Sequence, residues 1–267
     1  MSLLGGGKSP FHDDDGSADP RAAATLAAFG SGLGSEHAAL TALASARLLV
    51  PIVAAPPPTA GHDQPGDSGA GPAPAAAADH GAEMSLPTLI GRDGRAAIPA
   101  FTSLDTLARW DPDARPVPAL AGSVWRAAVD SSSAVVVDVA GPVPLAIEGA
   151  RLAALADGQP VPLPHQDPDV LAAVRAAVSG EPAIAGLRLA AGTGPAAGGG
   201  PAGGGPGDDA EAGSDLQLEL TLADGCAAAA GEAAARRLGG DLMNQLGERL
   251  RRGITIAVAR SGGHGGS

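Results

Sequence analysis

Residues 86–110 of the chain read LPTLIGRDGRAAIPAFTSLDTLARW, and this stretch decides the fold class. Two apolar runs flank a polar segment in which Asp93-Gly94 predicts a β-hairpin, because a two-residue type I′ turn needs a positive φ at both of its central positions. Ser103 then predicts the N-cap of a short helix, and Asp111-Pro112 predicts its end. A hairpin followed directly by a helix indicates a unit in which sheet and helix pack together.

The residues before this stretch predict two helices and a strand. Helices are expected from about Asp19 to Phe29 and from about Ser35 to Ala46, and the first residue of each is a good N-cap. The run RLLVPIVAA at 47–55 predicts a strand. Because Pro51 has no backbone N–H to donate, we expect this strand to lie at a sheet edge or to contain a bulge.

The residues after it predict a second hairpin between two helices. A helix is expected at about 120–129, and the nearly continuous apolar run AVVVDVA at 134–140 predicts a strand. The turn GPV leads into PLAIEG, which predicts the antiparallel partner strand. ARLAALA at 150–156 predicts a helix that follows the hairpin.

The C-terminal part repeats this mixture of elements. DPDVLAAVRAAVS predicts a helix and AIAGLRLA predicts a strand. In DLQLELTL at 215–222, leucine alternates with polar residues, which predicts an antiparallel strand with one buried face. A helix from about Cys226 to Arg251 carries leucine along one stripe, and GITIAVAR predicts a last strand.

These patterns predict an α+β fold. We expect two small mixed α/β units, whose antiparallel hairpins are covered by helices, interrupted by two disordered linkers rich in Gly, Pro and Ala. The predicted organisation is a flexible segment at 1–18, a domain at 19–157 with a disordered insert at 56–83, a domain at 160–260 with a disordered insert at 192–214, and a flexible tail at 261–267.

Composition disfavours two classes of protein. The chain of 267 residues has 17 basic and 29 acidic residues, a formal net charge of −12 and 2% aromatic residues, so nucleic acid is not an expected partner. The apolar runs are shorter than the ~20 residues of a membrane span, and the first residues lack the apolar core of a secretion signal. We therefore expect a cytoplasmic protein that has no membrane contact.

No motif in the sequence predicts catalysis, a cofactor or a metal. GGGKS at 5–9 lacks the first glycine and the preceding strand of a phosphate-binding loop, and DDDG at 13–16 lacks the flanking carboxylates of a calcium loop. The six histidines have no zinc-site spacing. Cys226 has no histidine nearby in sequence, and the serines at 131–133 lack a nucleophile-elbow motif. We predict no catalytic, cofactor-binding or metal-binding residues.

The few aromatic side chains are expected in the core. Trp110, Trp125 and Phe101 carry most of the aromatic volume of the chain, and packing is the commoner use of such residues.

The order of motifs resembles that of the SseB family, which is named for enhanced serine sensitivity. The resemblance covers about 11–157 through FHDDDGSADP, RLLVPIVA, the stretch 86–110, ARPVP and VVVDVAGPVPL. It implies the family's N-terminal domain and a link to serine or amino-acid metabolism, but it implies no catalytic residues. The use of arginine in place of lysine is typical of high-GC bacteria and fits an actinobacterial origin.

Three hypotheses about function follow. The first is a non-catalytic accessory or binding protein with an unknown protein partner, for which Arg92, Asp93 and Arg95 at the hairpin tip are the candidate interaction site. The second is a small-molecule sensor or enzyme whose site combines these three residues with Asp138. The third is a structural protein that dimerises through the edge of DLQLELTL or RLLVPIVAA. The oligomeric state is not predicted.

Overall fold

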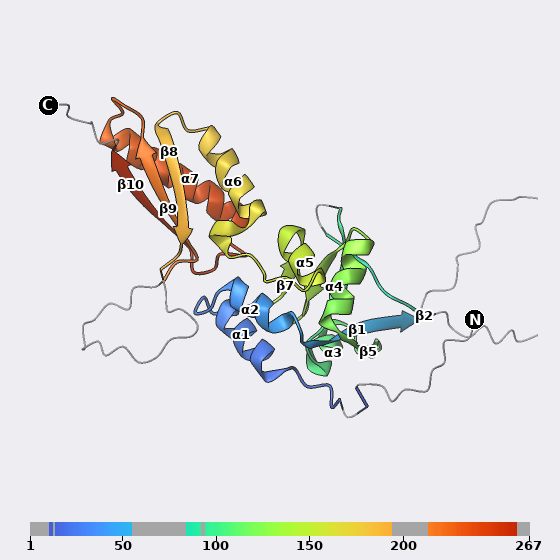
Figure 1. The fold of residues 1–267 in the computed structure, drawn as a ribbon. Helices are drawn as coiled ribbons and strands as arrows, with labels where there is room; N and C mark the ends of the chain where they lie inside the picture. Colours follow the sequence, from blue (N-terminus) through green and yellow to red (C-terminus); the bar gives the residue numbers. More distant parts are fainter. Residues whose placement is uncertain (1–10, 13, 55–83, 92–93, 194–212, 261–267) are drawn as a thin grey trace, which may run out of the picture.

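The computed structural model describes residues 11–12, 14–54, 84–91, 94–193 and 213–260, which form two units (Figure 1). One hydrophobic core gathers side chains between Ala22 and Val161, and another gathers side chains between Val170 and Ile256. Helices and small mixed sheets occur in both units, so the predicted α+β class is confirmed. The predicted linkers and tails fall wholly or largely outside the described residues.

A four-stranded sheet forms the centre of the first unit. Its order is β3-β4-β6-β7, where the strands are β3 (Leu89–Ile90), β4 (Ala96–Ala100), β6 (Ala134–Val137) and β7 (Leu145–Ile147). Both predicted hairpins are present, because β3 pairs antiparallel with β4 and β6 pairs antiparallel with β7. The two hairpins join through a parallel pairing of β4 with β6, which the sequence did not predict.

The turn of the first hairpin is one residue longer than expected. The Gly91 N–H donates to the Arg95 carbonyl over 2.8 Å, which leaves three residues between them instead of the two of a type I′ turn. The Gly94 N–H donates to the Gly91 carbonyl over 2.9 Å, and Gly94 has a φ of +79°. Glycine is therefore needed where the sequence predicted it, but at the end of a three-residue loop.

A three-stranded sheet of order β2-β1-β5 packs beside this one. It contains β1 (Arg47–Ala54), β2 (Met84–Ser85) and β5 (Arg115–Leu120), and both pairings are antiparallel. The prediction that β1 lies at an edge is wrong, since β1 is central. Leu49 exchanges backbone hydrogen bonds with Phe101 on the side away from β5. Pro51 has the same orientation as Leu49, so its missing N–H lies on that side and leaves the β1–β5 pairing intact.

Strand β5 was not predicted, because its sequence RPVPAL contains two prolines. Pro116 pairs with Pro51 and Pro118 pairs with Leu49. These are the positions whose backbone groups point away from β1, so proline costs the sheet no hydrogen bond there. The prolines also remove donors from the outer edge of β5, which discourages another strand from pairing with it.

Five helices surround the sheets of the first unit. They are α1 (Pro20–Gly30), α2 (Glu36–Leu43), α3 (Leu104–Trp110), α4 (Ala121–Asp130) and α5 (Gly149–Ala156). The side chains of Asp19 and Ser35 accept hydrogen bonds from backbone N–H groups in the first turns of α1 and α2, as the sequence predicts. Ser103 caps α3 in the same way.

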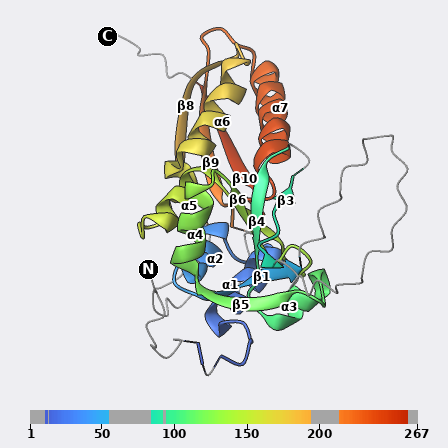
Figure 2. The ribbon, with the colours of Figure 1, turned by 90° about the vertical axis from the view of Figure 1, so that its right-hand side faces the viewer.

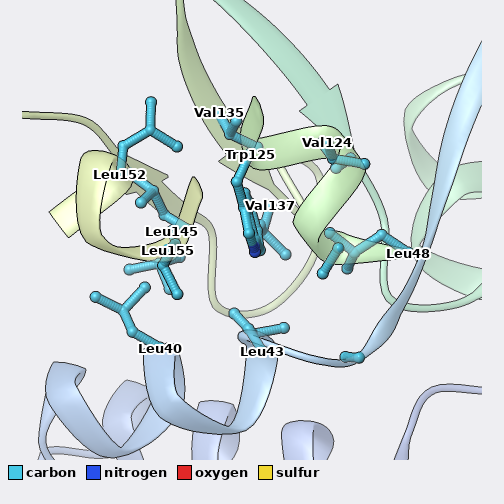
Figure 3. Close-up of a cluster of buried hydrophobic side chains, with 14 of the residues drawn as sticks. Leu40, Leu43, Leu48, Val124, Trp125, Val135, Val137, Leu145, Leu152 and Leu155 are labelled. Atoms are coloured by element: carbon cyan, nitrogen blue, oxygen red, sulfur yellow. The ribbon is translucent and has the colours of Figure 1, made fainter. Parts of the chain in front are cut away.

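Trp125 lies at the centre of the first core. Figure 3 shows its ring between α4, which carries it, and the leucines Leu40 and Leu43 of α2. Trp125 is fully buried, as predicted. Trp110 is only half-buried and packs on Phe101 at a ring-centroid distance of 5.5 Å in a smaller cluster.

The second unit is a three-stranded sheet with two helices on one face (Figures 1 and 2). Its elements are α6 (Pro168–Ser179), β8 (Ile184–Ala191), β9 (Leu216–Leu222), α7 (Ala228–Leu246) and β10 (Ile254–Arg260). The alternating leucines of β9 are buried against the helices, as predicted. Strand β9 pairs antiparallel with β8 and parallel with β10, so α7 is a crossover helix.

The position of β9 excludes it as a dimerisation edge. It is the central strand of the order β10-β9-β8, and both of its edges are paired. Because β1 is also central, neither strand named in the third hypothesis offers a free edge of the kind that hypothesis required. Among the described helices, none is both long and apolar enough to cross a membrane.

Buried ion pairs join the two units. The Glu36 carboxylate at the start of α2 contacts Arg151 of α5, and its other oxygen lies 3.4 Å from Nε of Arg249, which follows α7. Arg249 also contacts Asp167 at 2.5 Å, and Asp167 caps α6. Burial raises the pKa of Glu36 despite its arginine partners, and burial lowers the pKa of Arg151.

Candidate functional site

The predicted interaction tip is only partly described. Arg92 and Asp93 lie outside the described residues. Arg95 is exposed and forms an ion pair with Glu148 at 2.6 Å, and 64% of the Arg95 side chain remains accessible to solvent. An ion pair this exposed contributes little to stability.

Arg95 and Asp138 do not share a site. Arg95 immediately precedes β4, whereas Asp138 immediately follows β6. Because β4 and β6 run parallel, these positions lie at opposite ends of the sheet. The second hypothesis placed Arg95 and Asp138 in one site, and the structure contradicts that combination.

Asp138 lies instead in a pocket at the carboxyl ends of β4 and β6. This strand-end pocket has a volume of about 560 Å³. It is lined by Ala18, Ala23, Leu26, Ala27, Gly30, Ser31, Thr102, Ser103, Asp105, Thr106, Arg109, Asp138, Pro142 and Val143. Ligands of open sheets commonly bind outside the carboxyl ends of parallel strands.

Asp138 and Thr102 form the base of the pocket by joining the two strand ends. The Thr102 N–H donates to one Asp138 carboxylate oxygen over 2.8 Å, and the Thr102 hydroxyl donates to the other over 2.6 Å. The Asp138 N–H donates to the Ala100 carbonyl over 2.9 Å. Asp138 is 5% exposed and Thr102 is 5% exposed, so these bonds are shielded from water and hold the strand ends firmly.

The backbone at Asp138 is left-handed, with a φ of +51°. Aspartate tolerates this conformation better than most residues with a side chain, and non-glycine residues with positive φ cluster at functional sites. The left-handed turn ends β6 at Val137, three residues before the predicted end of this strand at 140. Gly141 completes the loop, because its N–H donates to the Asp138 carbonyl over 2.7 Å and a Cβ there would lie 2.9 Å from Cβ of Asp138.

Small residues on α1 leave the pocket open. Ala23 and Ala27 line it while remaining exposed, and Leu26 between them is buried in the core. Gly30 lies close to the loop after β6, since a Cβ at Gly30 would collide with Val143. The α1 wall is therefore apolar and closely packed at one end.

Helix α3 supplies charge on the other side. Asp105 and Arg109 line the pocket four residues apart, and both are exposed. The pocket thus combines an apolar wall, a buried carboxylate and two rim charges of opposite sign. This arrangement can hold a small molecule that has an apolar part and hydrogen-bond donors.

The remaining residues considered from sequence do not form a site. Asp14 of the acidic segment contacts Arg47 at 2.6 Å and accepts a hydrogen bond from the Gly16 N–H, so it has a structural role. Cys226 is half-buried before α7. Within the part of the chain that the structure describes, no three His, Cys, Asp or Glu side chains are grouped so as to hold a metal ion.

The sequence singled out Asp138 but missed Thr102. Both residues follow the ends of strands, Thr102 just beyond β4 and Asp138 directly after β6, and such positions are a signal that sequence reasoning can use. What the sequence lacked was the parallel pairing that brings them together across 36 positions of the chain.

Comparison with known proteins gives one match. Residues 22–154 match the family model described as the SseB protein N-terminal domain. No curated protein and no solved structure matches the chain. The matched region runs from α1 into α5 and contains all of the strand-end pocket except Ala18.

Proposed function

The chain belongs to the SseB family, and from that premise we propose that it is a non-catalytic accessory protein of the cytoplasm that binds a small ligand in the strand-end pocket. The observation that carries the proposal is the pocket itself, in which a wall of small apolar side chains faces the buried Asp138 carboxylate. A concave, largely apolar site with a few fixed polar groups is the usual form of a small-molecule site.

The hydrogen bonds that Asp138 accepts from Thr102 favour a binding role over a catalytic one. A general base must be free to accept a proton from its substrate. Both Asp138 oxygens already accept hydrogen bonds from Thr102, and these bonds hold the two strand ends together. The carboxylate can accept a further bond from a ligand while it keeps these two, since each oxygen has a second lone pair.

Amino acids are the first ligands to test. The resemblance to a family named for serine sensitivity favours a link to amino-acid metabolism. The pocket offers a carboxylate for an ammonium group, a guanidinium at the rim for a carboxylate, and an apolar wall for a small side chain. This complementarity supports the link without depending on the family name.

The test uses purified full-length protein and its thermal unfolding in the presence of each common amino acid. A ligand at a hundred times its Kd stabilises the folded state by about 2.7 kcal/mol, which raises the Tm by several degrees. Ala27→Trp places a large side chain in the pocket from an exposed position of α1. Ala24→Trp is the matched control, because Ala24 is also exposed on α1 and does not line the pocket.

We expect at least one amino acid to raise the Tm of the wild type and of Ala24→Trp, and to leave Ala27→Trp unchanged. An equal rise in all three proteins would place the binding site elsewhere. If no amino acid raises the Tm of the wild type, the proposed link to amino acids is wrong.

A protein partner is the second candidate function, and it is favoured by apolar exposure next to the first hairpin. Ile90 at the end of β3 is 68% exposed, and Leu86 just before this strand is 46% exposed. Exposed apolar residues of this size often mark protein-binding surfaces. With Arg95, the described residue of the predicted interaction tip, they would form one docking surface. Ile90→Asp should abolish the capture of a specific partner, whereas Leu33→Asp, at a leucine that is 80% exposed, should not.

A further inference from the structure

A small cavity lies between the two units, away from the strand-end pocket. Its volume is about 90 Å³. Its walls come from the start of α2, the short 3₁₀ helix Pro164–Gln166, the end of β8, the start of β9 and the residue two before β10. The lining residues are Ser35, His37, Leu163, Pro164, His165, Ala191, Gly192, Asp215 and Arg252.

Two histidines reach this cavity from different units. His37 belongs to α2, and His165 belongs to the 3₁₀ helix that precedes α6. The Nδ1 atom of each is buried and has no hydrogen-bond partner within the described residues. A buried polar atom without a partner is costly, and the two histidines that carry these atoms both line this cavity, which points to an occupant that bonds to both.

Arg252 adds hydrogen-bond donors that its ion pair with Asp215 holds in place. Its Nε donates to Asp215 over 2.8 Å, and its backbone N–H donates to the other oxygen of the same carboxylate over 2.9 Å. The Arg252 side chain is 16% exposed. Its two Nη atoms make no hydrogen bond to any described residue, which leaves up to four N–H donors available to an occupant.

From these groups we propose that the cavity binds a small oxyanion of the phosphate or sulfate type. Arg252 supplies paired guanidinium donors, and His37 and His165 each supply an Nδ1–H donor. The N-terminus of α2 adds the positive end of its dipole. The volume accepts an ion of this size and excludes a nucleotide or a larger phosphate ester.

A metal cation fits the same groups poorly. The guanidinium of Arg252 repels it, and the Asp215 carboxylate is already held by Arg252. The other charges nearby are Glu36, Asp167, Arg151 and Arg249, which pair with one another and sum to zero. Since the Asp215–Arg252 pair is balanced as well, the hydrogen-bond donors of the cavity, and not a net charge, favour an oxyanion.

A bound oxyanion would connect the two units. His37 comes from the first unit, while Arg252 comes from the second. The ion would therefore stabilise their docking in addition to the Glu36 ion pairs. The site shares no residue with the strand-end pocket, so the two proposals can fail independently.

The test is titration of the full-length protein with sodium phosphate at about pH 6.5, with ionic strength held constant by sodium chloride. Histidine ¹⁵N resonances report directly on Nδ1, and calorimetry gives the affinity. His37→Leu and His165→Leu each remove one donor without disturbing the Asp215–Arg252 pair. His12→Leu is the control, since His12 lies on the exposed N-terminal segment.

We expect phosphate to shift the Nδ1 resonances of His37 and His165 in the wild type and to bind at least tenfold more weakly to each Leu variant. Sulfate should compete with it. The proposal is wrong if neither Nδ1 resonance moves in the wild type, whatever the variants do. It is also wrong if the two Leu variants fold and bind phosphate as tightly as His12→Leu does.

Discussion

Replacing Asp138 should separate the two physical roles of this residue, which are to bind Thr102 and to adopt a left-handed backbone. Asp138→Ala removes two shielded hydrogen bonds to a charged acceptor, each worth about 1.5–3 kcal/mol. It also places alanine at a φ of +51°, which costs roughly 1–2 kcal/mol. Partial compensation by water brings the expected total loss of unfolding free energy to about 3–5 kcal/mol.

Two further variants divide this total. Asp138→Gly loses the same hydrogen bonds but adopts a positive φ without strain, so it should be about 1 kcal/mol more stable than Asp138→Ala. Asp138→Asn tolerates the left-handed backbone and keeps an acceptor for the Thr102 N–H, so we expect a loss of about 1–2 kcal/mol. Thr102→Val removes only the hydroxyl donor and should resemble Asp138→Asn.

The assay is urea unfolding followed by tryptophan fluorescence, with Trp125 reporting on the same core. The expected order of stability is wild type, then Asn, then Gly, then Ala. If Asp138→Ala is within about 0.5 kcal/mol of the wild type, the Asp138–Thr102 bonds do not hold the strand ends. If Ala is as stable as Gly, the left-handed backbone at this position carries no strain.

Other substitutions test the core, the hairpin and the contact between units. Trp125→Ala should lower the free energy of unfolding in urea by about 3–5 kcal/mol. Trp110→Ala should lower it by less, because its side chain is half-buried, and equal losses would contradict this. Gly94→Val should lose at least ~1 kcal/mol of unfolding free energy through its positive φ, since no described atom beyond its chain neighbours lies within 4 Å of a Cβ there, and an unchanged Tm would refute the turn geometry. Burial raises the pKa of Glu36 above its ordinary 4.5, so its contribution to stability is present below that pH and is lost as pH rises through the folded pKa. Glu36→Gln should remove this pH dependence in unfolding measured across the acid range, and an identical profile in both proteins would contradict it.

Local signals in the sequence predicted most of the individual elements. Asp19, Ser35 and Ser103 cap the helices that they were expected to cap, because an N-cap depends only on residues within one turn. The alternation of leucines in β9 predicted a strand with one buried face, which the structure confirms. Gly94 has the expected positive φ, although the loop is longer by one residue.

Pairings between distant segments could not be predicted from such signals. The parallel pairing of β4 with β6 joins residues 37 positions apart, and no local pattern records it. Strand β5 escaped prediction because Pro116 and Pro118 are tolerated only by virtue of their orientation toward the outer edge. Asp138 was named as a polar residue near a strand end, but its partner depends on that same parallel pairing.

The buried charges between the units were also beyond sequence reasoning. Arg151 belongs to a run of alanine and leucine, and helical periodicity alone does not show that it is buried. Its burial follows from a partner 115 positions away, Glu36, and Glu36 in turn contacts Arg249 from the second unit. The two histidines that line the cavity between the units are likewise 128 positions apart in the chain.

Native mass spectrometry of protein purified from its host without denaturation is the most direct test of whether the strand-end pocket holds a small molecule. We expect a discrete small-molecule adduct on the wild type and on Ala24→Trp, which is absent from Ala27→Trp. The same adduct on a folded Ala27→Trp protein, or no adduct on any of the three together with no ligand that protects the wild type from thermal unfolding, would contradict it.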